Sequence, residues 1–371
     1  MADYRNQHFV PKVHFRPFSI DGAGHAVKMY LTEDDRFIPA ASIKGQCAKP
    51  YLYGKDGRLE RLLGQFEGRY AHIVSRLADD QYKLSADDEW LLRYFVLLQS
   101  HRTAEQIERG FARISEMADF FQKAEEAHGN HWNPVNTPTR ELVMQELMIS
   151  VSEQMQEHVL DDLKLVIVRN KTRREFVTSD DPAVTTNRWL LQRKSINIFG
   201  TNAAGLLMFL PLTPHLLVLI YDPAVYNVNA ASRGKVDLTK EADVMAFNEH
   251  QYMRAVASVY FRGEEHARIA SEFKAVLPFR PAAWDRFTVA KKDGGTDTHT
   301  RYTVDSPEEV AKENAIMFHL AREWPSPPHW PSILKYRSNA QGFTRGRTII
   351  RRAHVEKFSD TPSVYSRVRR V

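Results

Sequence analysis

The pattern of apolar and polar positions changes three times along the chain, and each pattern predicts a different structure. Near the N-terminus, the stretch NQHFVPKVHFRPF places large apolar side chains among polar and charged ones. Chain ends usually fray, so an end this apolar is expected to dock into the fold and to carry its polar groups with it. Residues 25–47 then alternate in their first half, as a strand does, and the polar cluster at 32–36 predicts a turn.

Helical spacing of apolar residues follows. Residues 59–77 carry apolar side chains at the three- and four-residue intervals of an amphipathic helix. Ser85 followed by Asp88 predicts the N-cap of a second helix, whose nearly all-apolar centre indicates burial on several sides. A third helix is predicted through 108–126, and a fourth from near Thr137 and Pro138. This region is therefore a predicted block of about four helices.

Short apolar and β-branched runs replace the helical pattern at Leu163 and predict a sheet, with a hairpin that joins residues 165–168 to 175–177 through the turn RNKTRR. A helix is expected over 241–261, then a hairpin around Asp293, Gly294 and Gly295 and a helix start at Ser306. The predicted class is α+β, with a mixed or antiparallel sheet and an inserted helical block. The predicted organisation has four parts: an N-terminal strand-rich segment packing on the sheet (1–57), the helical block (58–162), a sheet-containing region with two further helices (163–335) and a basic C-terminal tail (336–371).

Composition narrows the class of protein. The 371 residues are 43% hydrophobic, which is enough to fill a substantial core. No stretch approaches the roughly 18 uninterrupted apolar residues of a membrane span. The one cysteine, Cys47, excludes an intrachain disulfide and a cysteine-based zinc cluster, and we expect it to be a buried core residue. These features predict a cytoplasmic protein without membrane contact.

The net charge of +5 is concentrated near the C-terminus. From Thr344 to Val371 there are eight Arg or Lys residues and two acidic ones, so the remaining residues sum to about −1. Aromatic residues lie among these cations, as they do in single-strand binders. A solvated basic extension, or a helix that meets an acidic partner, would have the same pattern. The predicted nucleic-acid contacts are Arg345, Arg347, Arg351 and Arg352.

Several short segments together resemble a known family. They are Asn6-Gln7-His8-x-Val10-Pro11 with Phe15-Arg16-x-Phe18, Phe176-x-x-Ser179-Asp180-x-Pro182-x-Val184, Pro211-Leu212-Thr213-Pro214, and the stretch from Lys49 to Arg76 that carries Glu67. As an ordered set over about residues 5–265, they resemble the family catalogued as domain of unknown function 4238. The resemblance implies a relationship to an uncharacterised family, and it assigns no catalytic residue.

Common catalytic signatures are missing from the sequence. It contains no GxGxxG, GxxxxGK[ST], HExxH or GxSxG motif, which disfavours Rossmann, P-loop, zincin and α/β-hydrolase chemistry. The candidates are instead isolated polar groups near apolar sequence. Pro182 disfavours a helical backbone at the residue before it, so one carboxylate of the Asp180-Asp181 pair is held in extended backbone at a strand end. A docked His8 needs a partner or a cavity. The predicted catalytic residues are His8, Asp180 and Glu67, and Asp180 and Glu67 would be the ligands if a divalent metal is present.

Five further residues are predicted to bind substrate: Gln7, Arg16, Lys44, Arg102 and Ser179. Each candidate also has an ordinary structural interpretation. Ser179 and Asp180 could be turn formers, His8 a hydrogen-bonded core histidine, Arg102 a partner of a helix C-terminal dipole and Lys44 a surface charge.

Two functions of different classes follow from these residues. A histidine or carboxylate base with arginines aimed at an anion suits hydrolysis of a phosphodiester, most plausibly by a nuclease. The alternative is a binding protein, such as a sensor, that holds a nucleotide-like or other anionic ligand without catalysis. A structural protein whose buried charges are core networks is the third interpretation. The enzymatic interpretation requires that His8, Glu67 and Asp180 converge, with at least two of Glu67, Arg102 and Asp180 near His8 or Arg16.

Overall fold

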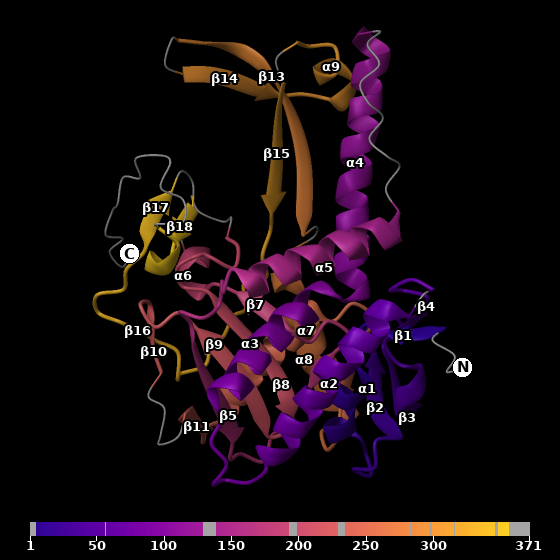
Figure 1. The fold of residues 1–371 in the computed structure, drawn as a ribbon, viewed down its shortest axis with the longest axis vertical. Coiled ribbons are helices and arrows are strands. Elements are labelled where there is room, and N and C mark those ends of the chain that lie inside the picture. Colours follow the sequence, from indigo (N-terminus) through magenta and orange to yellow (C-terminus); the bar gives the residue numbers. More distant parts are fainter. Residues whose placement is uncertain are drawn as a thin grey trace.

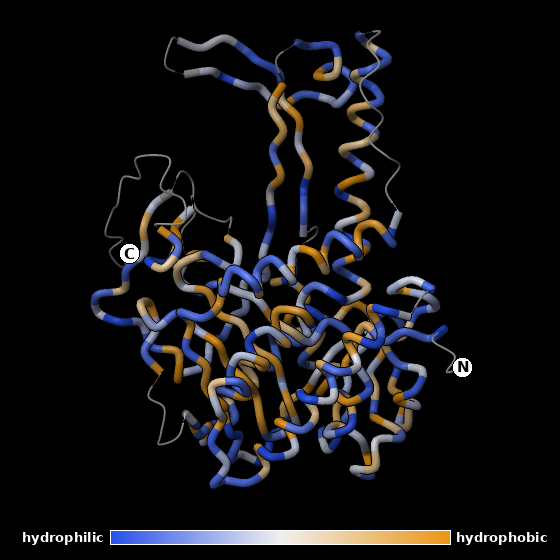
Figure 2. Tube along the Cα trace, viewed as in Figure 1, coloured by the Kyte–Doolittle hydropathy of each residue, from blue (hydrophilic) through white to orange (hydrophobic). Residues whose placement is uncertain are grey.

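The fold is a body of sheets and helices from which a long arm projects (Figure 1). The structure is a computed structural model that describes residues 5–55, 57–128, 139–192, 199–228, 234–281, 284–296, 299–314, 316–345 and 348–355. Its helices and mostly antiparallel sheets confirm the predicted α+β class. Hydrophobic positions concentrate in the body and recur along the arm (Figure 2).

The main sheet of the body has five strands in the order β11-β5-β9-β8-β7. Neighbouring strands are antiparallel except β11 and β5, which are parallel. The β8–β9 hairpin is the apolar run GLLMFLPLTPHLLVLIYD, so this part of the predicted sheet is confirmed. The bounds are β5 Lys164–Asn170, β7 Val184–Thr186, β8 Leu207–Thr213, β9 Leu216–Tyr221 and β11 Lys235–Leu238.

Helices pack on both faces of this sheet because its strands alternate their apolar side chains between the two faces. One face meets the predicted helical block, whose four helices are present. Ser85 caps the second helix through the expected capping box with Asp88. Thr139 caps the fourth helix, and Thr137 and Pro138 lie outside the described residues. The bounds are α2 Arg58–Arg76, α3 Ala86–His101, α4 Ala104–His128 and α5 Arg140–Gln156.

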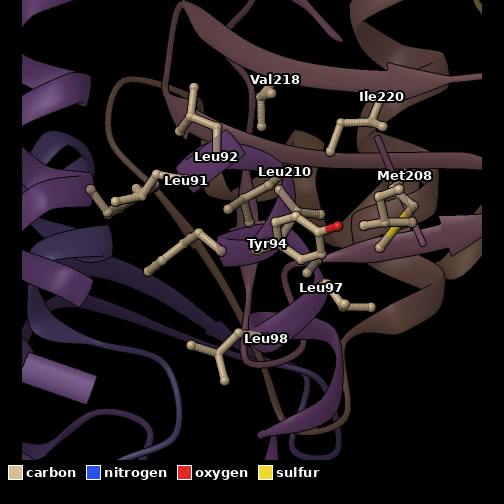
Figure 3. Close-up of a cluster of buried hydrophobic side chains, with 14 of the residues drawn as sticks. Leu91, Leu92, Tyr94, Leu97, Leu98, Met208, Leu210, Val218 and Ile220 are labelled. Carbon is tan, nitrogen blue, oxygen red and sulfur yellow. The ribbon is translucent and has the colours of Figure 1, made fainter. Parts of the chain in front are cut away.

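The helix α3 forms the centre of this packing. Figure 3 shows its side chains Leu91, Leu92 and Tyr94 among residues of β8 and β9. Every residue from Tyr94 to Ser100 is buried, which confirms the expectation of a helix enclosed on several sides. Within the described chain, no helix combines the length and apolarity needed to cross a membrane.

A second sheet has the order β3-β2-β12-β6. The predicted hairpin from 165–168 to 175–177 is wrong, because β5 pairs with β9 and β11 whereas β6 pairs with β12. The Asn170 side chain donates to Arg174 O and closes a loop that leads the chain into the other sheet. The helix predicted over 241–261 ends at Arg254, and its last residues form β12 instead. The bounds are β2 Ala26–Leu31, β3 Arg36–Ser42, β6 Thr178–Ser179, β12 Ser258–Phe261 and α7 Glu241–Arg254.

The N-terminal stretch lies against the body with Phe9, Val10, Phe15 and Phe18 buried, and Cys47 is buried in the same apolar cluster. Its short strand pairs with residues 48–50. The remaining elements of the body are β1 Asn6–His8, α1 Lys12–Phe15, β4 Ala48–Pro50, α6 Arg188–Leu191, β10 Tyr226–Asn227, α8 His266–Val276, β16 Lys335–Tyr336, β17 Phe343–Arg345 and β18 Thr348–Ile350.

The arm consists of the outer part of α4 and a three-stranded sheet of order β14-β13-β15 (Figure 1). The hairpin predicted around Asp293–Gly295 is confirmed as β13–β14, and Ser306 caps α9 as expected. Phe120 of α4 packs with Val289 and Val310 in a small cluster of its own. The bounds are β13 Asp285–Thr296, β14 His299–Val304, α9 Pro307–Val310 and β15 Ile316–Arg322.

The described part of the basic C-terminal segment is integrated into the body. Ile349 and Ile350 are core residues. The Arg351 side chain is buried, and its Nε donates to Asp162 Oδ2 at 2.7 Å. Its terminal nitrogens donate to backbone carbonyls of Thr201 at 2.5 Å and Val159 at 2.6 Å. Arg351 therefore ties this segment to the body.

Asp180 ties the end of β6 to the start of β12. Its carboxylate accepts backbone N–H bonds from Val256 at 2.9 Å, Ala257 at 2.7 Å and Ser258 at 3.2 Å. Burial raises the pKa of Asp180 to about 6, although the three donors oppose this rise.

Replacing Arg351 by alanine should lower the free energy of unfolding by about 3 kcal/mol or more, because Asp162 and two carbonyls lose a buried cationic partner. The neighbouring Arg352 is exposed, so R352A should change the free energy of unfolding by less than about 0.5 kcal/mol. Urea unfolding of both variants measures the difference. Equal effects of the two substitutions would contradict the anchoring role.

Replacing Asp180 by asparagine should reveal how its carboxyl group links stability to pH. The folded-state pKa of about 6 exceeds the ordinary 3.8, so the folded chain holds this proton more tightly than the unfolded one. Relative to D180N, the wild type should therefore lose up to about 3 kcal/mol of stability as the pH rises from about 4 to 6, and no more above that. Urea unfolding of both chains across this range tests the sign. A difference that grows with pH would contradict it.

Candidate functional site

The predicted site residues occupy separate positions. His8 is buried with its Nε2 at 3.2 Å from Lys44 O, a backbone partner. Burial lowers the pKa of His8, so its imidazole is neutral near pH 7. The Lys44 side chain and Arg16 are exposed. Gln7 is buried and braces the loop that follows β4, because its side chain donates to Gly54 O at 2.8 Å and accepts from Tyr53 N at 2.5 Å.

Glu67 and Arg102 do come together. Arg102 is fully buried, and its Nη1 donates to Glu67 Oε1 at 2.8 Å. Its Nε donates to Gln99 Oε1 at 2.9 Å, so the guanidinium is held by α2 and by its own helix end. Its charge helps to lower the pKa of His8. Among the hydrogen bonds of the described residues, however, none joins Glu67 or Arg102 to His8 or Arg16.

Asp180 and Ser179 lie together at the end of β6, with Asp180 bound to the loop 256–258. The Ser179 hydroxyl donates to Gln251 Oε1 at 3.1 Å. The structure therefore does not bring Asp180, Glu67 and His8 into one contacting cluster. In the part of the chain that the structure describes, no three His, Cys, Asp or Glu side chains are grouped to hold a metal ion.

Of the four arginines predicted to contact nucleic acid, Arg351 points inward and Arg352 is exposed. The Arg345 side chain and Arg347 lie outside the described residues. Nucleic-acid binding by this segment stays a prediction.

A cavity of about 370 Å³ lies where the helical block, the end of α7 and the base of the arm meet. Its wall combines cationic and aromatic side chains from segments far apart in the sequence. The residues that give the cavity its character are Arg109, Arg254, Arg322, Trp284, Trp324 and Phe199.

Each cavity arginine is paired with a carboxylate that is not part of the wall. Arg109 Nε donates to Glu105 Oε1 at 2.7 Å, one helical turn away. Arg322 Nε donates to Asp285 Oδ1 at 2.7 Å across the β13–β15 pair. Arg254, at the end of α7, pairs with the fully buried Asp181. The carboxylates orient the guanidinium groups, and the remaining N–H groups are available at the wall.

Flat aromatic rings accompany these arginines. The Arg109 guanidinium lies 3.9 Å from the centroid of the Trp284 ring, and the Arg254 guanidinium lies 5.3 Å from it. Phe199 and Trp324 stack with centroids 4.0 Å apart. Cation–π contacts of this kind fix the planes of the side chains.

The cavity wall carries uncompensated polar groups and crowded positive charge. Arg254 Nε and Trp324 Nε1 are buried donors for which the described residues offer no acceptor. Burial, followed by repulsion from Arg254, lowers the pKa of Arg109 to about 10, so Arg109 is still charged near pH 7. These buried donors suit a ligand that brings hydrogen-bond acceptors, while Glu153 and Glu157 on the same wall oppose a ligand's negative charge.

His101 at the end of α3 also lines the cavity. Its Nδ1 lies 2.9 Å from Leu97 O, one helical turn back. Burial lowers the pKa of His101, and the charges of Arg322 and Arg254 lower it further. The cavity wall also includes Glu153 of α5 and Glu157, the residue that follows this helix, and both are exposed.

None of these cavity residues was predicted from the sequence. One signal was present: Arg254 lies within the helix predicted over 241–261, between Met253 and Ala255, and a buried arginine needs a partner just as a buried His8 does. Asp181, beside the selected Asp180, is that partner. The convergence of Trp284, Trp324 and Arg109 depends on tertiary packing and has no local signature.

The comparisons with known proteins agree with the ordered motifs of the chain. A family model described as "Protein of unknown function (DUF4238)" matches residues 6–265. No curated protein and no solved structure matches the chain significantly. The family match spans all of the main sheet, the helical block and Arg109 and Arg254 of the cavity. The chain is therefore a member of the DUF4238 family.

Proposed function

We propose that the cavity binds a small anionic ligand that carries a flat ring, and that this ligand is nucleotide-like. The observation that supports the proposal is the convergence of Arg109, Arg254 and Arg322, each oriented by its own carboxylate, beside Trp284 and Trp324.

The anionic part of the ligand is inferred from charge. Arg109 and Arg254 repel one another in a partly desolvated wall, and an anion between them relieves this repulsion. Arginine binds phosphate and carboxylate oxygens through paired N–H groups, and such charge-assisted bonds are stronger than neutral ones. The carboxylates behind the arginines hold them in place before the ligand arrives, which reduces the entropy lost on binding.

The flat part of the ligand is inferred from Trp284, Trp324 and Phe199. Aromatic side chains stack on planar rings such as nucleobases, whatever the base. The volume of about 370 Å³ is within the range of small-molecule sites, which is roughly 300–1,000 Å³. A mononucleotide offers both the anion and the ring.

This proposal differs in its residues from the nuclease interpretation, which depended on His8, Glu67 and Asp180. Those three residues are bound to other protein groups, whereas the cavity has donors without acceptors. The single, buried and free Cys47 fits a reducing, cytoplasmic environment for such a binding protein.

Isothermal titration calorimetry with adenosine monophosphate, pyrophosphate and uncharged adenosine tests the proposal. We expect the monophosphate to bind more tightly than adenosine. R109Q and R322Q should each weaken its binding by at least about tenfold, because a hydrogen bond to a charged group contributes about 1.5–3 kcal/mol.

The matched control is R268Q, since Arg268 is also paired with a carboxylate but lies on α8 and away from the cavity. Its affinity for the monophosphate should equal that of the wild type. If the wild type binds neither adenosine monophosphate nor pyrophosphate, the proposed function is wrong. If R268Q loses as much affinity as R109Q, the ligand site lies elsewhere.

Ligand binding in the cavity should not depend on His8, which was predicted from the sequence to be catalytic. H8Q keeps a donor for Lys44 O, so its affinity for adenosine monophosphate should stay within about twofold of the wild type. The same calorimetric titration measures it. A tenfold loss of affinity in a folded H8Q variant would indicate that the ligand binds near the N-terminal segment instead.

A further inference from the structure

We propose that His101 is the general base of a phosphodiester-cleaving reaction in the cavity, a proposal that rests on anion binding by the cavity arginines. The substrate class is therefore a phosphodiester with a flat ring on at least one side. Three features of His101 support this role: the orientation of its imidazole, its neutral state and its cationic neighbours.

The orientation of His101 follows from its backbone contact. Leu97 O can only accept a hydrogen bond, so the ring nitrogen 2.9 Å away, Nδ1, carries the proton. Nε2 is then the basic nitrogen with a free lone pair. Among the described residues no hydrogen bond to Nε2 is found, and the side chain lines the cavity. The imidazole thus presents an acceptor in the same wall as the guanidinium donors of Arg109, Arg254 and Arg322.

Two other buried histidines show why His101 differs. His14 is bonded through both ring nitrogens, to Tyr70 Oη at 3.2 Å and to Thr178 Oγ1 at 2.8 Å. His250 is fully buried between Phe209 and Trp330 and lines no described cavity. His101 combines a bonded Nδ1 with access to a cavity.

The charged groups around His101 set its protonation. Arg109 of α4, Arg254 of α7 and Arg322 of β15 line the same cavity, and so do Glu153 of α5 and Glu157 just after this helix. Burial and the nearby charges of Arg322 and Arg254 lower the pKa of His101 below 6.5, so the imidazole is neutral near pH 7. A base must be neutral before it accepts a proton, and this one is.

The reaction balances without another reactant besides water. A water molecule attacks the phosphorus of the bound diester while His101 Nε2 takes a proton from the water. The new O–P bond forms and one ester P–O bond breaks. The imidazolium returns the proton to the leaving alkoxide, which gives a monoester and an alcohol. The arginines stabilise the charge on the phosphoryl oxygens in the transition state.

The test uses the full-length protein with bis(4-nitrophenyl) phosphate and with a short end-labelled single-stranded RNA. We expect the wild type to cleave at least one of them. H101Q should lower kcat by about a hundredfold or more, the usual contribution of general-base catalysis. Its affinity for adenosine monophosphate should change by less than about threefold, since glutamine is neutral and polar.

The matched control is H25Q, because His25 is an exposed histidine outside the cavity, and it should keep the wild-type rate. The pH profile gives a readout that a structural role would not produce. The wild-type kcat/KM should rise with pH through a pKa below 6.5, as His101 loses its proton, and this acid limb should be absent in H101Q.

The outcomes separate this proposal from the proposed function. If the wild type binds adenosine monophosphate but cleaves neither substrate, His101 is not a base and the binding function stands. If H101Q is folded and keeps the wild-type rate, the assignment is also overturned. H101N provides a second variant in case H101Q does not fold. If neither variant folds, a wild-type acid limb at or above pH 6.5 overturns the proposal.

Discussion

The burial of the C-terminal end of α3 is the constraint on which the rest of the structure depends. This end packs against the main sheet, so its polar residues cannot reach bulk water and each must find a partner. Gln99 donates to Phe9 O at 2.8 Å, which holds the N-terminal stretch, and Arg102 binds Glu67, which holds α2. His101 bonds to its own helix and lies at the cavity. One helix end therefore organises three neighbouring regions.

The neighbouring carboxylates Asp180 and Asp181 fix the opposite side of the cavity. Asp180 holds the backbone of 256–258, and Asp181 pairs with Arg254 immediately before that loop. The turn from α7 into β12 is thus bound at two points by adjacent residues of one strand end. As a result, the strand end that orients Arg254 is the end of β6, the strand that pairs with β12 in the second sheet. The arrangement of the cavity wall is a consequence of sheet topology.

Local signals explain what could be predicted from the sequence. The Ser85 cap, the apolar centre of α3 and the extended structure of the apolar run that forms β8 and β9 depend on neighbours within a few residues, and these were predicted. The hairpin that joins β8 to β9 was not predicted. The pairing of β6 with β12 joins residues about 80 apart, so the pattern around RNKTRR indicated a hairpin that does not form. Glu67 and Arg102 carry opposite charges, so their residue types alone are compatible with an ion pair. The cavity draws on six helices and strands and on the loops beside them, and no short window of the sequence contains its pattern.

The cavity wall contains charged and polar groups whose burial is energetically unfavourable. Buried ion pairs contribute little net stability compared with apolar packing, because desolvation opposes their attraction. Arg254 adds a buried Nε for which the described residues offer no acceptor, and it repels Arg109. An apolar wall of the same shape would avoid these costs. The main core beneath α3 is apolar, and its burial offsets the unfavourable groups of the cavity wall. Functional sites are where such local inconsistencies are expected.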